Sequence, residues 1–365
     1  MSDLFDPDVL AVQALDHATA LPARYYTDPR MPALDATAVF EPSWQLVCHQ
    51  SQLAGVGDHV VTSIAGLPLI VVRSDATTIR AFHNVCRHRA GPIARCNGRG
   101  ASDLRCRYHG WTYGLDGVLR GAPEMGRTAD FDPASIHLPE VRVKRWQGLV
   151  LIAAGDPPPF DEVVAGIDAR LHSTHAFDQY ELHHHASWLV DCNWKVYVDN
   201  YLEGYHVPHI HPGLNSVLDY RSYSTETARW HSFQSSPLAS DDDLYGSGEA
   251  LYYFLYPNTM LNILPGRLQT NRVLPLGVDR CQVDFDFYYA PIAAPEAMTR
   301  RGRDVAFSDE VQDEDVAICA EVQRGLASGS YESGRLNPLR ENAVHHFHEL
   351  LRRAYSAAGA SSNAR

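Results

Sequence analysis

Two short cysteine–histidine pairs are the residues of this sequence best suited to chemistry. Cys86 and His88 are separated by one residue, and Cys106 and His109 are separated by two. Glycines such as Gly91 lie beside these pairs, and a glycine lets the backbone approach a bound group closely. Two thiolates and two imidazoles on paired loops are ligands for a metal ion or a metal cluster.

Two kinds of site fit these ligands, a structural zinc ion and a Rieske [2Fe–2S] cluster. In a Rieske cluster the imidazoles replace thiolates on one iron, and neutral imidazole removes negative charge from that iron, so the added electron settles there. A zinc finger would place both cysteines before both histidines, whereas here each cysteine is followed by its own histidine. A buried thiol or a core imidazole explains one such residue but not four in two matched motifs. The order of the ligands therefore favours the cluster over zinc.

A second dense group of polar residues lies in the segment 199–211. On a helix, Asp199, Glu203 and His206 stand on one face, because they are four and three residues apart. Pro208 is expected to end this helix, since a proline disfavours helical geometry at the residue before it. The segment therefore predicts one polar helical face followed by a turn.

After this turn, His211 is expected to return toward His206. Two imidazoles with one carboxylate from elsewhere form a 2-His-1-carboxylate facial triad, which is the ligand set of non-haem Fe(II) oxygenases. Three protein ligands leave positions open for oxygen and substrate. On spacing alone, His209 could replace His211.

The third ligand can be predicted from helical periodicity. The apolar stripe of the segment 309–326 consists of Val311, Ile318, Val322 and Leu326. Asp315 falls on this stripe, whereas Asp313 and Glu321 point elsewhere and Glu314 lies nearer the edge. A carboxylate on a core-facing stripe is costly unless it has a metal or cation partner. Asp315 is therefore the predicted carboxylate ligand, and the alternative is a surface acid in a different helical register.

The elements that position the cysteine–histidine pairs are short strands. Between residues 40 and 154, β-branched and aromatic runs such as Val60–Ile64 and Leu69–Val72 alternate with glycine turns, a pattern typical of an all-β sandwich or barrel. The three prolines at 157–159 cannot join a central strand or a helix interior. They predict a domain boundary near residue 155.

The elements beyond this boundary are mixed. The sequence predicts a helix around 193–205, strands near 250–255, 270–275 and 282–289, and two helices near the end. Such a mixture indicates an α+β domain with helices on an antiparallel sheet. Residues 1–39 are expected to form a lead-in segment with one short helix.

Composition excludes several classes of partner. The chain has 365 residues and a formal net charge of −13, which opposes binding to nucleic acid or to an anionic membrane surface. No apolar run is long enough to span a membrane, and the first residues lack the features of a secretory signal, so we expect a cytoplasmic protein. Seven cysteines in a long chain argue against a disulfide framework.

Together the two motifs resemble those of the Rieske non-haem iron oxygenases, in particular their catalytic α subunits. The resemblance covers roughly residues 40–355, and the C-terminal half is similar to the choline monooxygenase group. The supporting segments include Asn193-Trp194-Lys195, Asp199 to Pro208, Tyr256-Pro257-Asn258, Glu314-Asp315-Val316 and His345-His346-Phe347-His348.

The resemblance implies a fold and a ligand set. The expected fold is α+β, with a lead-in (1–39) packed on the catalytic domain, an all-β Rieske [2Fe–2S] domain (40–155), and a helix-grip, START-like catalytic domain (156–365). The implied cluster ligands are Cys86, His88, Cys106 and His109, and the implied ligands of a mononuclear Fe(II) are His206, His211 and Asp315.

The resemblance also implies an assembly. It assigns Glu203 as the acidic bridge between a cluster histidine of one subunit and an iron histidine of its neighbour, with Asp199 as the competitor on the same helical face. The electron would then cross a subunit boundary, which predicts a homotrimer, or a trimer elaborated with other subunits. Electrons would come from NAD(P)H through a separate flavin/iron–sulfur reductase, since no G-x-G-x-x-G element opens a βαβ unit in this chain.

The expected substrate depends on tyrosines and one arginine. An aromatic cage binds a quaternary ammonium by cation–π attraction, and Tyr197 and Tyr205 are candidates for its walls. The strand edge that carries a tryptophan in plant choline monooxygenases here contains Arg267, which would oppose a cation and favour a carboxylate. A betaine carries both charges and would fit both features, and an aromatic acid would fit almost as well.

The leading interpretation is a monooxygenase that hydroxylates a methyl or alkyl C–H bond next to a quaternary or tertiary nitrogen. The alternative within the same family is ring hydroxylation of an aromatic acid. Two interpretations from other classes are a pure electron carrier, which leaves the second constellation unexplained, and a structural zinc protein.

Overall fold

The computed structural model describes the chain except for residues 1, 172–176, 239–243, 246–247, 293 and 364–365. The chain divides into two compact units. The first comprises Met1–Phe40, Pro158–His175 and Leu182–Arg365, and the second comprises Glu41–Pro157 and Ala176–Glu181. No helix in the described residues is long and apolar enough to cross a membrane.

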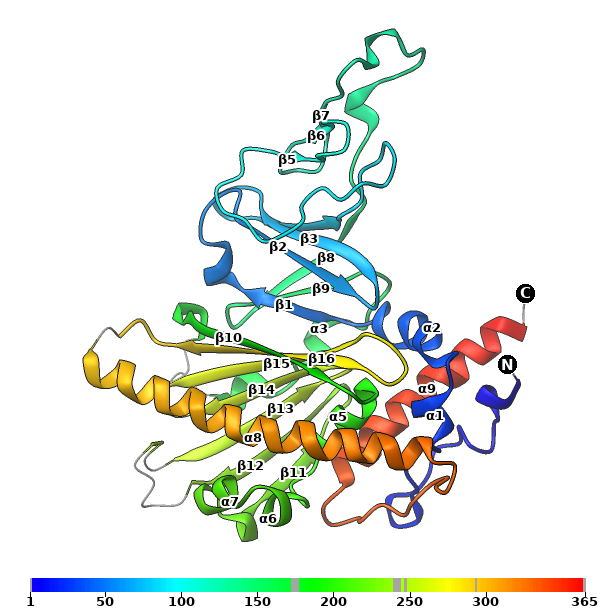
Figure 1. The fold of residues 1–365 in the computed structure, drawn as a ribbon, viewed down its shortest axis with the longest axis vertical. Helices are drawn as coiled ribbons and strands as arrows, with labels where there is room; N and C mark the ends of the chain where they lie inside the picture. Colours follow the sequence, from blue (N-terminus) through cyan, green and yellow to red (C-terminus); the bar gives the residue numbers. More distant parts are fainter. Residues whose placement is uncertain (1, 172–176, 239–243, 246–247, 293, 364–365) are drawn as a thin grey trace. The chain divides into compact units, whose positions relative to one another are not determined.

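The second unit consists of strands, loops and short 3₁₀-helical turns (Figure 1). A six-stranded sheet has the order β1-β9-β8-β4-β3-β2, and a small three-stranded sheet has the order β5-β6-β7. The bounds are β1 Gln45–His49, β2 His59–Ile64, β3 Leu67–Arg73, β4 Ile79–His83, β5 Leu104–Arg105, β6 Thr112–Tyr113, β7 Leu119–Gly121, β8 Glu140–Trp146 and β9 Leu149–Ala153. The all-β architecture expected for this half is confirmed.

The first unit is built on one seven-stranded sheet. Its order is β10-β16-β15-β14-β13-β12-β11, and neighbours from β11 to β16 are antiparallel. The bounds are β10 Glu181–Val190, β11 Ser224–Thr227, β12 His231–Pro237, β13 Glu249–Leu255, β14 Thr259–Leu264, β15 Arg267–Pro275 and β16 Cys281–Tyr289. Along each strand of such a sheet, every second side chain lies on the same face. Each strand therefore directs one row of side chains toward the helices.

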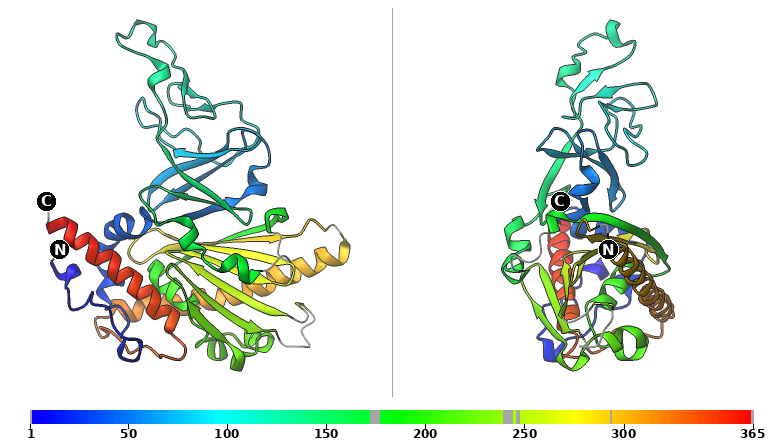
Figure 2. Two further views of the ribbon diagram at one scale, coloured as in Figure 1. Left: turned by 180° about the vertical axis from the view of Figure 1, so that it is seen from behind. Right: turned by 90° about the vertical axis from the view of Figure 1, so that its left-hand side faces the viewer.

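Two long helices, α8 (Pro295–Ala327) and α9 (Asn342–Asn363), accompany this sheet (Figures 1 and 2). The short helix α5 (Trp194–Tyr201) lies against both α8 and β15, and α9 contacts β11 and β12. The other α-helices in the described residues are α1 Arg24–Thr27, α2 Met31–Asp35, α3 Phe160–Val163, α4 Ile167–Leu171, α6 Val207–Ile210 and α7 Pro212–Val217. The predicted α+β class is confirmed.

Two details of the helical prediction were wrong. The helix expected over 193–205 ends at Tyr201, and Pro208 lies in the first turn of α6 instead of ending a helix. A proline is tolerated in a first turn because its missing N–H has no partner there. Glu203 and His206 therefore lie in an irregular connection, not on the face of one continuous helix.

The apolar stripe predicted for the segment 309–326 was also wrong in part. α8 begins at Pro295, and its buried residues are Asp304, Gln312, Cys319 and Gln323. Val322 is 44% exposed. The helix therefore turns a largely polar row toward the sheet, which indicates a solvated or ligand-binding space between them.

Candidate metal centres

Two loops of the second unit carry the four predicted cluster ligands in matched conformations. The N–H of Ala90 donates to the carbonyl of Cys86 at 3.0 Å, and the N–H of Gly110 donates to the carbonyl of Cys106 at 3.0 Å. Ala90 and Gly110 both have positive φ, 56° and 74°, which reverses the chain directly after each histidine segment. The local sequence therefore folds the two halves as a pair.

The two thiols lie buried beside one another in the core of this unit. Burial and the neighbouring Cys86 raise the pKa of the Cys106 thiol, so two thiolates there require a cation. The hydroxyl of Tyr113 lies 3.3 Å from the sulfur of Cys86 and accepts the N–H of Arg87 at 3.0 Å, which leaves its own proton to donate to sulfur. A side chain at Gly91 would begin 3.1 Å from the sulfur of Cys106, so the loop closes tightly around the thiols.

The two imidazoles face each other with ring centroids 4.6 Å apart. The Nδ1 atom of His88 is buried and has no hydrogen-bond partner in the described part of the chain, as expected for an atom that binds a metal. The ring of His88 also stacks on Trp111 at 4.8 Å. Desolvation and the positive charges of His88 and Arg89 lower the pKa of His109, which favours the neutral, ligating form.

The spacing of the four predicted ligands distinguishes a site for an iron–sulfur cluster from a site for a single metal ion. Around one zinc ion all ligand atoms lie within about 4 Å of one another, given bond lengths of about 2.0–2.3 Å. Among the described residues, the only group of three or more potential ligands within 4.8 Å of one another is His206, His211 and Asp315. Cys86, His88, Cys106 and His109 instead form a thiol pair and an imidazole pair, which fits two bridged irons and argues against the zinc interpretation.

His206, His211 and Asp315 of the first unit converge on one point. The Nε2 atoms of His206 and His211 are 3.1 Å apart, and Oδ1 of Asp315 lies 3.0 Å from Nε2 of His211 and 3.7 Å from Nε2 of His206. The alternative ligand His209 is exposed and lies outside this group. The two histidines flank α6, whereas Asp315 reaches them from the middle of α8.

Each of these imidazoles is held from behind by a carboxylate. The Nδ1–H of His206 donates to Glu203 at 2.5 Å, and the Nδ1–H of His211 donates to Glu314 at 2.6 Å. Because a carboxylate only accepts hydrogen bonds, these contacts place the protons on Nδ1 and leave both Nε2 lone pairs directed at the shared point. These two lone pairs and the carboxylate oxygen of Asp315 lie close enough together to attract a cation.

The electrostatics of His211 support the same conclusion. Burial lowers its pKa, but hydrogen bonds to Asp315 and Glu314 outweigh burial and raise it overall. Asn200 fixes Asp315 by donating from Nδ2 to Oδ1 at 2.6 Å. The residues present thus fit a divalent metal, which would replace the proton that these acids otherwise attract.

A cavity of about 130 Å³ opens onto this triad. Its floor is a row of polar side chains paired across four strands, namely Gln234, Tyr252, Asn262 and Gln269. Among the described residues, five tyrosines line it: Tyr197, Tyr201, Tyr223, Tyr245 and Tyr252. Such a cavity suits a compact substrate with both apolar and polar groups.

The three residues predicted to contact substrate have different positions. Tyr197 lines the cavity and donates its hydroxyl to Gln312 at 2.5 Å. Arg267 also lines it, paired with Asp304 at 2.6 Å. The prediction for Tyr205 was wrong, because Tyr205 is 47% exposed and does not line the cavity. Since α5 ends at Tyr201, the chain turns Tyr205 to the surface.

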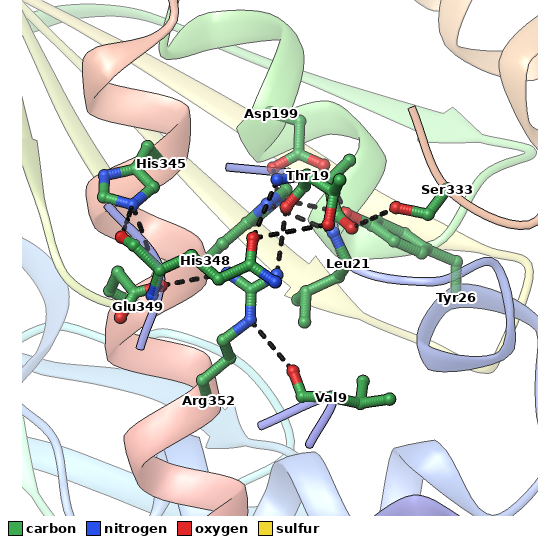
Figure 3. Close-up of polar contacts among 12 residues, drawn as sticks. Val9, Thr19, Leu21, Tyr26, Asp199, Ser333, His345, His348, Glu349 and Arg352 are labelled. Atoms are coloured by element: carbon green, nitrogen blue, oxygen red, sulfur yellow. Dashed lines mark hydrogen bonds and ion pairs between the residues drawn. The ribbon is translucent and has the colours of Figure 1, made fainter. Parts of the chain in front are cut away.

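Asp199 and Glu203 have different partners. Asp199 accepts hydrogen bonds from Tyr26 at 2.7 Å and from Nε2 of His348 at 2.9 Å, and the N–H of Leu21 fixes the other ring nitrogen of His348 (Figure 3). Glu203 contacts both the ring and the backbone N–H of His206. Glu203 thus acts directly on a triad histidine, whereas Asp199 ties α5 to the N-terminal segment and α9.

Sequence reasoning missed Glu314, Asp304 and the polar floor of the cavity. Glu314 is adjacent to Asp315, and no local pattern indicates that it meets His211. The floor had a usable signal, because Arg267, Gln269 and Asn271 alternate along β15. Large polar residues at every second position of a strand indicate a polar face.

Comparisons with known proteins agree with this geometry. Residues 43–137 match the Rieske [2Fe-2S] domain, and residues 171–357 match the ring hydroxylating alpha subunit (catalytic domain). The chain is 38% identical to the chloroplastic choline monooxygenase of Arabidopsis thaliana, over 95% of this chain and 84% of that protein. It is 30% identical to the carnitine monooxygenase oxygenase subunit of Escherichia coli K12, over 93% of this chain and 94% of that protein.

A solved structure shares the fold. The quaternary ammonium Rieske monooxygenase CntA in complex with gamma-butyrobetaine is 25% identical and matches with a TM-score of 0.83, over 93% of this chain and 96% of that one. The chain therefore belongs to the Rieske non-haem iron oxygenases, as an α subunit that carries a [2Fe–2S] cluster and a mononuclear iron.

Proposed function

We propose that this protein is a monooxygenase that hydroxylates a C–H bond beside a quaternary or tertiary nitrogen, using O2 and electrons from NAD(P)H delivered by a separate reductase. The observation that carries the proposal is the tyrosine-lined cavity that opens onto His206, His211 and Asp315. Tyrosine faces attract an alkylammonium group by cation–π interaction. The relatives named for choline and carnitine oxidation support the same substrate class.

The division of labour follows from the two groups of ligands. We assign the cluster to residues 40–155, the iron to residues 156–365, and a supporting role to the lead-in 1–39. The proposed cluster ligands are Cys86, His88, Cys106 and His109, and the proposed iron ligands are His206, His211 and Asp315. When bound, the iron supplies oxygen activation with electrons that the cluster passes singly.

The chain's own side chains orient the reaction. Glu203 and Glu314 keep the two imidazoles directed at the metal position through the hydrogen bonds described above. The tyrosine walls, including Tyr197, hold the ammonium group and exclude water from it. An N-methyl or N-alkyl carbon of the bound substrate then lies next to the metal position, where hydroxylation gives an alcohol or, by collapse, an aldehyde and the dealkylated amine.

We further propose that the active assembly is a homotrimer in which Glu203 links the triad to a neighbour's cluster. A second cavity, of about 620 Å³, has Glu203, His206, Asp199 and Glu341 in its lining, so an acidic opening leads to the triad histidine. The cluster loops carry six exposed arginines: Arg87, Arg89, Arg95, Arg99, Arg105 and Arg107. Opposite charges on the two surfaces favour docking of one copy onto another.

The proposed function is tested by coupled oxygen consumption. Reduced enzyme is incubated with trimethylammonio compounds and, in parallel, with aromatic acids, and oxygen uptake is compared with product formed. We expect stoichiometric product with an alkylammonium compound. Uptake without product from every alkylammonium compound, together with a hydroxylated ring from an aromatic acid, would establish the alternative. A cytoplasmic location and the flavin/iron–sulfur type of the reductase stay predictions from the sequence.

A further inference from the structure

Arg267 lines the cavity beside the proposed iron triad and carries a buried hydrogen-bond donor that has no acceptor among the described residues. The residue begins β15, is 5% exposed and lines this cavity. Its Nε atom is buried and has no hydrogen-bond partner in the described residues. Because a buried N–H without an acceptor is costly, this position calls for an acceptor from a bound molecule.

Asp304 holds one nitrogen of the guanidinium and balances its charge. Nη1 of Arg267 donates to Oδ1 of Asp304 at 2.6 Å, and Asp304 also accepts the hydroxyls of Tyr245 and Tyr289. Asp304 is 3% exposed. The pair carries no net charge, so Arg267 does not repel a substrate cation as an isolated arginine would, yet its remaining donors keep a fixed direction.

A second donor without an acceptor lies closer to the triad. Nε2 of Gln312 is buried and has no partner in the described part of the chain, while its Oε1 accepts the hydroxyl of Tyr197. Gln312 precedes Asp315 by less than one turn of α8, which places it about 5 Å along the helix axis. Asp304 lies further in the same direction, about 16 Å from Asp315 at 1.5 Å per residue. The acceptors of a bound substrate are therefore expected to extend away from the iron toward Arg267.

We infer that Arg267 is a specificity-determining residue that binds a carboxylate of the substrate, with Asp304 as its positioning residue. The inference rests on the proposed function, because it places the ammonium end at the triad and the anionic end at Arg267. A carboxylate gains a charge-assisted hydrogen bond from a guanidinium N–H, which is stronger than a bond to a neutral hydroxyl. The substrate class is thus a zwitterionic trimethylammonio acid, in preference to the corresponding alcohol.

The test compares a trimethylammonio acid with the trimethylammonio alcohol of equal chain length. Calorimetric binding to the intact, metal-loaded enzyme is measured for wild type and Arg267→Gln. We expect Arg267→Gln to weaken binding of the acid about 30-fold, as the loss of a charged hydrogen bond implies, and to leave binding of the alcohol nearly unchanged.

Three further variants separate binding from folding. Arg272 lies on the same strand, pairs with Asp284 at 3.0 Å and does not line the cavity, so Arg272→Gln should leave binding of the acid unchanged. The double variant Arg267→Gln/Asp304→Asn avoids an unpaired buried carboxylate and should show the same selective loss as Arg267→Gln. Asp304→Asn alone should raise KM for the acid more than it lowers kcat.

The outcomes distinguish this inference from the proposed function. Coupled turnover of both compounds by wild type, with equal effects of Arg267→Gln on acid and alcohol, would overturn the role of Arg267 and leave N-alkyl hydroxylation standing. Failure of wild type to bind or oxidise either compound would overturn both.

Discussion

The two candidate metal centres hold their imidazoles in different ways. At the mononuclear site, His206 and His211 each donate Nδ1–H to a carboxylate of the same chain, Glu203 or Glu314. At the cluster site, Nδ1 of His88 has no partner within the described residues. The first site is thus prepared by side-chain hydrogen bonds before any metal binds. The second is prepared by backbone turns and leaves its ligand atoms for the cluster.

The sites also differ in how far apart their ligands lie in the chain. The proposed cluster ligands occupy two neighbouring loops with the same backbone hydrogen bonds. By contrast, Asp315 follows His211 by 104 residues and belongs to a different helix. A local defect in a loop is therefore expected to damage the cluster, whereas the iron site depends on the packing of α8 against the sheet.

The largest effect is expected for Asp315→Ala. Loss of one of the three proposed ligands should abolish mononuclear iron and lower turnover at least about 10³-fold, as for removal of an essential catalytic group, while the visible absorption of the cluster stays intact. Iron and sulfide analysis with visible spectroscopy measures both centres. His209→Ala, an exposed neighbour of the triad, is the control and should retain iron. Loss of cluster absorption in Asp315→Ala would show that the two sites are not independent.

Glu314→Ala should weaken iron binding by about 10- to 100-fold, because partners behind a metal-binding histidine typically contribute this much. Iron retention is measured during dialysis against a chelator of graded concentration. Asp313→Ala, an exposed acid on the same helix, should behave as wild type. Equal iron affinity in Glu314→Ala and wild type would mean that the hydrogen bond from His211 to Glu314 does not prepare this imidazole for the metal, and would contradict the comparison of the two sites.

Glu203→Gln should leave iron content near normal, since the amide oxygen still accepts the Nδ1–H of His206. The lost charge is expected to slow electron transfer between cluster and iron about tenfold, equivalent to about 1.4 kcal/mol of activation free energy. Reoxidation of the reduced cluster with oxygen and substrate is followed by stopped-flow absorption. Slow transfer in Asp199→Asn together with normal transfer in Glu203→Gln would reassign the bridge to Asp199.

Tyr113→Phe should produce the smallest change. It removes the hydroxyl that lies 3.3 Å from the sulfur of Cys86, and a hydrogen bond to sulfur favours the reduced cluster. The reduction potential should fall by on the order of 40 mV, which corresponds to about 1 kcal/mol for one electron. Redox titration followed by EPR measures it, and an unchanged potential would mean that the Tyr113 proton does not point at the sulfur.

Prediction from sequence succeeded where a few neighbouring residues decide the geometry. The convergence of His206 and His211 with Asp315 matches the expected triad, although the route to it was partly wrong. Tyr205 was assigned to the cavity because the polar segment read as one helix, yet α5 ends at Tyr201. Asp315, expected on a core-facing stripe, is half-buried and lines the cavity, and Val322 of the same expected stripe is exposed, because a cavity admits polar side chains on the face of α8 that faces the sheet.

The residues themselves determined the ligand types and their spacing within each loop, since backbone geometry over a few residues depends on local sequence alone. The α+β class followed from hydrophobic periodicity for the same reason. Only the tertiary structure decided which acid meets which imidazole, and that Asp304 neutralises Arg267. These pairs join residues from separate strands and helices, and their contacts depend on how α8 packs against the sheet, which no local pattern encodes.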